Sequence, residues 1–335
     1  MTLALVLMSC GGGGGAVGPG PQIGTIDIGA VPAQTLRDGG TLRWPLAGFP
    51  PNFNYNHLDG TYVPNEEVIG SVMPYLFLSQ ADGTVKINEN YLKTAELTSA
   101  NPQVGTYTLR DEAAWSDGTP ITWRDFQAQW QALNRSNSAF LISSSTGYTD
   151  IASVERGTSD KQVVVTFART FSDWQSLFTP LYPASTNTNP QVFNTGWTQR
   201  LPVTAGPFKV TQIDQTAKTI TVVRDEQWWG PKPRLDRIIF RDIPAEAGFD
   251  ALANNEIDFV DIGPDINAFT RAQTTPAVVV RKALAPNFRH ITFNGRPGTI
   301  LADQQLRIAI QKGINTRAIT QAQIGRIVPD PAPLT

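Results

Sequence analysis

The stretch from Tyr107 to Leu133 constrains the fold of this chain more than any other part of the sequence. At its start, Tyr107 and Leu109 alternate with polar neighbours, which predicts a short strand. The turn signal Ser116-Asp117-Gly118 follows, where glycine can adopt a positive φ without a Cβ clash. The stretch therefore begins as a strand that reverses direction.

A helix is predicted directly after this turn. Thr122 is placed to cap the free N–H groups of the first helical turn, and Asp125 can reach back to complete a capping box. Phe126, Trp130 and Leu133 recur at i, i+4 and i+7, which gives the helix one apolar face. A capped strand, turn and helix of this kind is typical of α/β proteins.

Composition excludes several classes of protein. The 335 residues can form two domains or one large one, and 27 basic against 29 acidic residues leave no positive field for nucleic acid. The single cysteine, Cys10, cannot close an internal disulfide. The two histidines, His57 and His290, are too few and too isolated for a zinc site. We therefore expect no metal, no cofactor and no nucleic-acid partner.

The N-terminus carries the features of a lipoprotein. The apolar run Met1–Met8 leads into Leu7-Met8-Ser9-Cys10, which has the form of a bacterial lipobox and predicts lipid attachment at Cys10. Gly11–Gly15 then read as a flexible tether. Because no basic residue precedes the short apolar run, we expect the true start to lie upstream. A short buried N-terminus with a chance cysteine is the alternative.

The string Trp115–Thr122, followed by an acidic helix start and an aromatic helix face, resembles a segment of the family 5 extracytoplasmic solute-binding proteins. These are the peptide-binding and related lipoproteins that serve ABC importers. Further similar segments follow in the same order at Thr204–Val210, Arg224–Gly230, Arg289–Asn294 and Asp303–Ile310. The first of these departs from the family pattern in its first two residues.

This resemblance implies an α/β fold of the periplasmic-binding-protein type (class II, cluster C) with a mixed, largely parallel sheet. The order of helix then strand along the chain favours the same kind of sheet. Residues 1–35 are expected to form the signal remnant and tether, 36–57 and 196–275 the main part of lobe I, 58–195 a subdomain inserted into lobe I, and 276–335 the start of lobe II. Family members are commonly much longer, so we expect a complete first lobe and a truncated second lobe.

Sequence patterns predict the other elements as well. Strands are expected at Thr41–Leu46, Gln162–Phe167, Thr219–Arg224, Ile238–Arg241, Ile257–Val260 and Arg289–Asn294. Helices are expected at Val68–Leu78, from Ser172 to Pro180, at Glu246–Leu252 and at Asp303–Ile310, and a surface loop at Pro183–Pro190. Asn255 is suited to a left-handed helix cap.

The candidate ligand-binding residues come from the resemblance, which implies that the loop after the first strand lies at the cleft between the lobes. Phe53, Asn54, Tyr55 and Asn56 in this loop combine aromatic faces with amide groups, as suits a polar organic ligand with apolar parts. Asn294, where the chain enters the second lobe, is a further candidate. An ordinary loop with its rings turned inward is the alternative.

The resemblance further implies a monomeric, lipid-anchored binding protein outside the cytoplasm, without enzymatic activity. It would capture an oligopeptide or another medium-sized solute and deliver it to the permease subunits of an ABC importer. One alternative is a diverged lipoprotein of this fold that acts in cell-envelope construction without transport.

A second alternative is a carbohydrate-active extracellular enzyme. In it Trp228 and Trp229 would stack on a sugar, and Asp258, Asp261 or Asp265 would supply the carboxylates for glycoside cleavage. Packing residues at a sheet edge and carboxylates that cap loops would explain the same residues without any chemistry.

Overall fold

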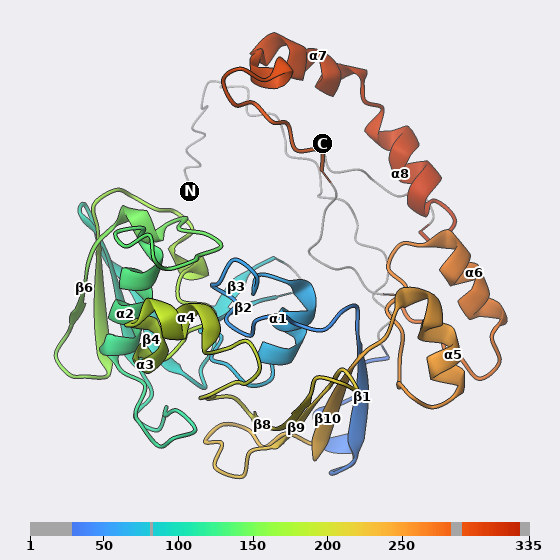
Figure 1. The fold of residues 1–335 in the computed structure, drawn as a ribbon, viewed down its shortest axis with the longest axis horizontal. Coiled ribbons are helices and arrows are strands. Elements are labelled where there is room, and N and C mark those ends of the chain that lie inside the picture. The colour runs from blue at the N-terminus through green and yellow to red at the C-terminus, as the bar shows by residue number, and fades with distance from the viewer. Residues whose placement is uncertain (1–28, 81–82, 283–289, 329–335) are drawn as a thin grey trace, which may run out of the picture. The chain divides into compact units, whose positions relative to one another are not determined.

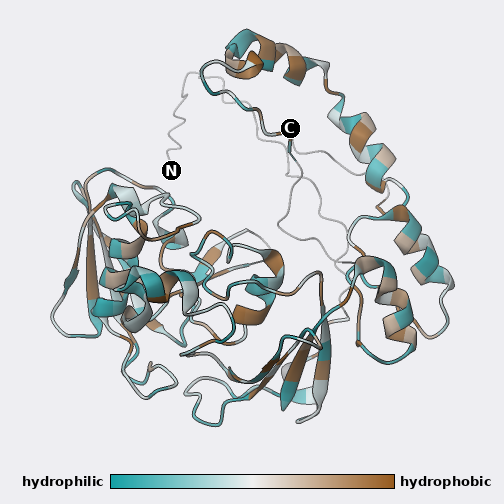
Figure 2. Cartoon of the chain, viewed as in Figure 1, coloured by the Kyte–Doolittle hydropathy of each residue, from teal (hydrophilic) through white to brown (hydrophobic). Residues whose placement is uncertain are grey.

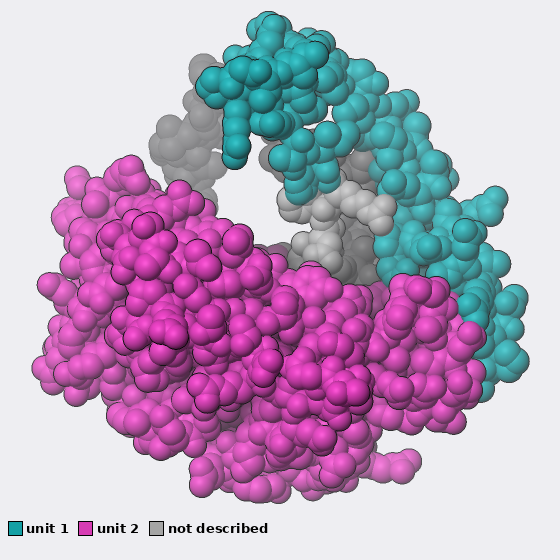
Figure 3. Space-filling view, in the orientation of Figure 1, with its two compact units in different colours: residues 1–30, 262–335 teal, residues 31–261 magenta. Residues whose placement is uncertain are grey.

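The computed structural model describes residues 29–80, 83–282 and 290–328, and the chain divides into two compact units. One unit comprises residues 31–261 and the other residues 1–30 together with 262–335 (Figure 3). The predicted lipid-attachment residue Cys10 and the glycine tether lie outside the described residues.

The larger unit contains a four-stranded sheet in the order β1-β10-β9-β8 (Figure 1). Its strands are β1 (Thr41–Leu46), β8 (Phe208–Asp214), β9 (Thr219–Arg224) and β10 (Arg237–Asp242). β1 runs parallel to β10, whereas β10 with β9 and β9 with β8 are antiparallel. Hydrophobic residues recur along these strands (Figure 2), and Ile220, Val222 and Phe240 are buried in the core.

A second four-stranded sheet of the same unit has the order β4-β5-β7-β6 and is antiparallel throughout. It consists of β4 (Leu92–Ala100), β5 (Gln103–Leu109), β6 (Ile151–Arg156) and β7 (Gln162–Phe167). β2 (Phe77–Ser79) and β3 (Val85–Ile87) form a separate antiparallel pair. Every second residue of β5 and β7 is buried, so one face of this sheet lies on the core.

Helix α2 (Trp123–Leu133) begins as its sequence predicts. The Thr122 side chain accepts the N–H of Arg124 at 3.3 Å, and the Thr122 N–H donates to the Asp125 carboxylate at 2.8 Å, which completes the capping box. Phe126 and Leu133 are buried on its inner face. The turn before the helix places Gly118 at φ +84°, as expected.

The remaining helices are short. In the larger unit they are α1 (Val63–Ile69), α3 (Ala184–Asn187), α4 (Pro190–Thr195) and α5 (Gly248–Ala253). The other unit contributes α6 (Ile266–Thr274), α7 (Gln304–Gly313) and α8 (Thr316–Ile324). Single 3-10 turns occur at Ala33–Thr35, Tyr148–Asp150, Trp174–Ser176, Ala245–Ala247 and Ile300–Ala302.

The mixed sheet is confirmed, but the expectation that it is largely parallel is wrong. Among the described residues only β1 and β10 pair in parallel. The other neighbours are antiparallel, most of them because they follow each other along the chain, and β5 with β7 after an intervening helix and strand. The predicted strand Ile257–Val260 is also not formed. There the Asp258 N–H donates to the Arg43 carbonyl at 3.0 Å, but the Arg43 N–H donates to the Asp258 carboxylate at 2.6 Å, so one of the two bonds beside β1 goes to a side chain.

Several predicted boundaries hold and others do not. The strands at 41–46, 162–167 and 219–224 are confirmed, and Asn255 adopts φ +57° as expected for a left-handed cap. The helix predicted at Val68–Leu78 is wrong: α1 starts five residues earlier, with a proline in its first turn, and ends before Gly70.

Other predicted elements also differ from those in the structure. The helix expected from Ser172 is only the 3-10 turn Trp174–Ser176. The expected surface loop Pro183–Pro190 contains α3, whose Thr186 and Asn187 are buried. The described residues 290–294 form no strand, whereas the helix near Asp303–Ile310 is confirmed as α7.

Candidate functional site

The loop between β1 and α1 holds four of the predicted ligand-binding residues, and the structure divides them into two pairs. The side chains of Phe53 and Asn54 are fully buried. Phe53 belongs to the hydrophobic core, and the Asn54 amide donates to the carbonyl of Phe193 at 3.0 Å. Tyr55 and Asn56 are half-buried. In this structure, therefore, the first pair supports the loop and only the second pair offers surface.

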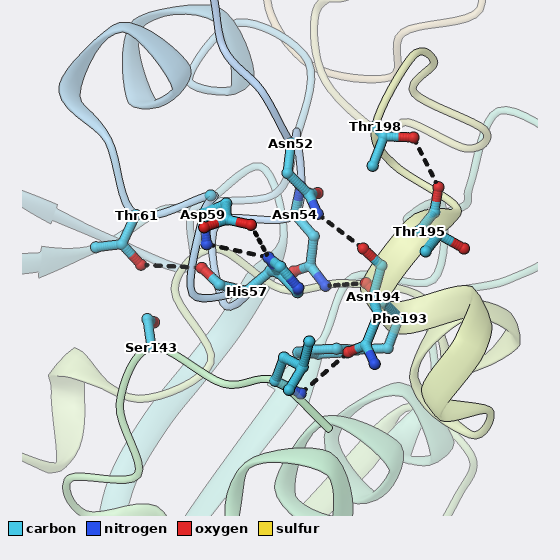
Figure 4. A network of polar contacts seen from close by, with 12 residues as sticks. Asn52, Asn54, His57, Asp59, Thr61, Ser143, Phe193, Asn194, Thr195 and Thr198 are labelled. Atoms are coloured by element: carbon cyan, nitrogen blue, oxygen red, sulfur yellow. Dashed lines mark hydrogen bonds and ion pairs between the residues drawn. The ribbon is translucent and has the colours of Figure 1, made fainter. Parts of the chain in front are cut away.

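A network of asparagine side chains attaches this loop to α4 and to residues 139–143 (Figure 4). The Asn52 amide donates to the carbonyl of Asn194 at 3.0 Å, and the Asn194 side chain accepts the N–H of Leu141 at 3.0 Å. The Asn56 carbonyl accepts both the N–H and the hydroxyl of Ser143, at 2.9 and 3.2 Å. The loop is thus held at Asn52 and Asn56 by groups far away in sequence.

His57 is buried inside this network (Figure 4). Its Nδ1 accepts the N–H of Asp59 at 3.0 Å, which requires an unprotonated Nδ1. Burial lowers the pKa of His57, and the nearby Asp59 carboxylate opposes this shift. Among the described residues its Nε2 has no hydrogen-bond partner. The imidazole is therefore held neutral as part of the loop's structure.

Tyr55 directs its hydroxyl to the exposed carboxylate of Glu66 on α1, at 3.3 Å. Burial, followed by the charge of Glu66, raises the pKa of Tyr55 to about 12, so the phenol remains protonated and can donate. The hydroxyl of nearby Tyr75 is buried without a partner among the described residues, and burial raises its pKa strongly.

The carboxylates of Asp261 and Glu66 both lie within electrostatic reach of Glu67, beside this loop. Burial raises the pKa of half-buried Glu67, and the charges of Asp261 and Glu66 raise it further, while a hydrogen bond from the Trp44 indole acts in the opposite direction. The Trp44 ring packs edge-on against Phe259 at 4.9 Å. Like charges held together in this way favour a bound cation or ammonium group.

Sequence reasoning missed the large apolar side chains that this region exposes. Leu58 is 63% exposed, Val63 66% and Leu141 49%. The N–H of Leu58 donates to the carbonyl of Leu141 at 2.9 Å, so the two residues lie side by side. For Leu58, its place in a loop rich in Asn, Asp and Gly was the signal that could have identified it.

Asn294, the fifth predicted ligand-binding residue, belongs to the unit formed by residues 1–30 and 262–335. It is exposed, its side-chain oxygen accepts the N–H of Arg296 at 3.4 Å, and its carbonyl accepts the Thr299 hydroxyl at 2.7 Å. Its contacts are those of a turn residue.

The two adjacent tryptophans are half-buried and pack against the core of the larger unit. The rings of Trp228 and Trp229 each lie 5.7 Å from the ring of Tyr91, and the Trp229 indole donates to the carbonyl of Asn90 at 2.6 Å. These contacts favour a packing role over stacking on a sugar.

Two of the carboxylates considered for glycoside cleavage have structural partners. Asp258 accepts the Arg43 guanidinium Nε at 3.0 Å, and this hydrogen bond lowers the pKa of Asp258. Asp265 caps α6 by accepting the N–H of Ala268 at 2.9 Å. The lowered pKa of Asp258 is the opposite of what a general acid requires, and Asp265 already serves as a helix cap. In the described part of the chain, no three His, Cys, Asp or Glu residues are placed to hold a metal ion. No helix there has both the length and the apolar character needed to cross a membrane.

The class of protein follows from the comparison with known families. The model of the family "Bacterial extracellular solute-binding proteins, family 5 Middle" matches residues 89–327. This chain belongs to the bacterial extracellular solute-binding proteins of family 5.

Individual proteins of known or assigned ligand are also similar to this chain. The oligopeptide-binding protein OppA of Mycobacterium tuberculosis is 40% identical over 344 residues, covering 100% of this chain and 58% of OppA. The same bacterium's "probable monoacyl phosphatidylinositol tetramannoside-binding protein LpqW" is 30% identical over 268 residues, covering 78% of this chain and 42% of LpqW. The solved periplasmic EDTA-binding protein EppA has 32% identity and a TM-score of 0.67, covering 71% of this chain and 46% of EppA. The chain thus spans little more than half the length of OppA.

Proposed function

We propose that this protein is an extracytoplasmic binding protein that captures an oligopeptide, or a similar medium-sized solute, for delivery to an ABC importer. Membership of family 5 and the similarity to OppA over the whole chain support this proposal. The observation that carries it is the surface around the loop between β1 and α1, where exposed apolar side chains, a tyrosine hydroxyl and three carboxylates occur together.

This surface fits the chemistry of a peptide. Leu58, Val63 and Leu141 offer apolar contacts. The Tyr55 hydroxyl, whose proton is donated to Glu66, can accept a hydrogen bond from a peptide N–H. The carboxylates near Glu67 favour an ammonium group, such as the amino terminus of a peptide or a lysine side chain. The solute we propose therefore combines apolar side chains with positive charge.

The proposal includes the partners and the location of the protein. It would act as a monomer, be attached to the outer face of the membrane through lipid on Cys10, and pass its solute to permease subunits. The lipobox at Leu7–Cys10 and the glycine tether support the anchor. No catalytic residue is part of this proposal.

Calorimetry with two defined peptides tests the proposal. A pentapeptide of lysine and leucine should bind the full chain, and a pentapeptide of glutamate and leucine should bind at least about tenfold more weakly, a difference of about 1.4 kcal/mol. Tyr55→Ala and Leu58→Ala should each weaken binding of the lysine peptide without unfolding the protein. The matched control is Leu97→Ala, an exposed leucine on β4. Unchanged affinity in both loop variants would remove this loop from the site.

A second candidate function is recognition of a cell-envelope glycolipid without transport. The similarity to LpqW favours it, because that relative's name assigns it a mannosylated phosphoinositide. Titration with a phosphatidylinositol mannoside separates the two: saturable binding of this lipid and none of the lysine peptide would favour the second candidate.

A further inference from the structure

The hydroxyl of Tyr182 is bonded to the backbone of the loop that carries the candidate site. It donates to the carbonyl of Phe53 at 2.7 Å and accepts the N–H of Tyr55 at 2.8 Å. Tyr182 is fully buried, and burial raises its pKa strongly, so the hydroxyl keeps the proton that it donates. One side chain thus fixes two backbone groups on either side of Asn54.

Helix α2 fixes Tyr182 in turn. The Gln129 side chain accepts the N–H of Tyr182 at 2.8 Å and donates to the carbonyl of Pro180 at 3.1 Å and to the hydroxyl of Tyr148 at 3.2 Å. Gln129 is 1% exposed, and its two side-chain polar atoms both have partners. The amide thereby holds the backbone of residues 180–182 against the helix.

Two further contacts strengthen this connection. The Asp125 carboxylate of the capping box also accepts the N–H of Ala184 at 2.8 Å, so the start of α2 holds the chain just beyond Tyr182. The Tyr182 ring meets that of Trp197 edge-on at 4.8 Å, and the Trp197 carbonyl accepts the N–H of Phe53 at 2.9 Å.

We propose that Tyr182 is a positioning residue for the candidate solute-binding loop, and that its hydrogen bond with Gln129 sets the loop position from α2. The position of the half-buried Tyr55 side chain depends on where the backbone of Tyr55 is held. Hydrogen bonds in a buried network hold the backbone firmly in place. Breaking one of them leaves a buried polar group without a partner, which costs free energy. The inference rests on the proposed function only in assuming that this loop contacts the solute.

Hydrogen exchange in the free protein tests the positioning directly. Tyr182→Phe keeps the ring but removes the hydroxyl, so the Tyr55 amide should exchange about tenfold faster or more, while amides of β5 change little. The matched control is Tyr91→Phe, another buried tyrosine, whose hydroxyl donates to the carbonyl of Ala205 at 2.7 Å. This control should leave the Tyr55 amide unchanged. An unchanged Tyr55 amide in Tyr182→Phe would overturn the inference.

Gln129→Met tests the connection to α2 and replaces Tyr182→Phe if that variant does not fold. It should accelerate exchange at the Tyr55 amide although the Tyr182 hydroxyl is still present; no acceleration would overturn the role of α2. Calorimetry with the lysine-leucine pentapeptide should then show a dissociation constant at least about fivefold higher for Tyr182→Phe than for the unmodified protein. The dissociation constant of Tyr91→Phe should be unchanged. If the unmodified protein binds no peptide, the proposed function fails, and the exchange result still decides the positioning role.

Discussion

Glu67 is a half-buried carboxylate whose position costs stability in the free protein. Its pKa is raised by burial and by the charges of Asp261 and Glu66. A raised pKa means that the folded state favours the protonated acid, so the stabilising contribution is present below the unfolded pKa and is lost as the pH rises through the folded pKa. At pH 7 the ionised group therefore opposes folding, and the ammonium group of the proposed solute would offset this cost.

We predict that Glu67→Gln increases the free energy of unfolding at pH 7 and weakens binding of the lysine-leucine pentapeptide. Urea denaturation and calorimetry measure the two effects. The control Glu96→Gln, on the exposed face of β4, should change the unfolding free energy by less than about 0.5 kcal/mol. A Glu67→Gln variant that is less stable and binds equally well would contradict this interpretation.

His57 makes the loop sensitive to acid. Its pKa is lowered by burial, so the unfolded chain binds a proton more readily than the folded one, and stability falls as the pH drops below the unfolded pKa. We predict that the free energy of unfolding decreases between pH 7 and pH 5 and that His57→Asn reduces this decrease. His290→Asn, an exposed histidine in the other unit, is the control that retains the decrease. An equal pH dependence in both variants would argue against this role of His57.

At the scale of the element, α2 carries the start signals that sequence analysis identified. Thr122→Ala should lower the free energy of unfolding by about 0.5–2 kcal/mol, measured by urea denaturation, because one capping hydrogen bond is lost. Asp125→Ala should cost more, since this carboxylate binds the N–H groups of both Thr122 and Ala184. Equal losses in the two variants would show that the contact with Ala184 contributes nothing.

Local sequence patterns were sufficient to predict some helices and strands but not others. The β-branched run of β7 and the turn and cap before α2 were predicted because neighbours in sequence decide them. α3 was missed, because its four residues are held by distant contacts such as the bond from Ala184 to Asp125.

The candidate site shows the same limit. The sequence predicts this loop as the candidate site but does not predict which of its side chains are buried. Phe53 and Asn54 are bonded to Tyr182 and Phe193, which lie more than a hundred residues further along the chain. Neighbouring residues in the sequence therefore do not reveal that these two side chains are buried. The exposed Leu58 and Val63 were overlooked because their exposure depends on that same folding.

For the whole molecule, the lipobox at Leu7–Cys10 carries the proposal that the protein is anchored to a membrane by lipid. We predict that Cys10→Ser moves the protein from the membrane fraction to the soluble fraction after secretion. Immunoblotting of the two fractions measures this. A variant that remains with the membranes would exclude anchoring through Cys10.

The solute that we propose is a peptide of apolar and positively charged residues. Native mass spectrometry of the protein, purified gently from bacteria grown on a peptide-rich medium, tests whether such a peptide is bound. We expect one protein chain carrying one bound peptide, and the released peptides should be enriched in apolar residues and positive charge. A folded protein that carries no peptide, or that releases only a glycolipid, would contradict it.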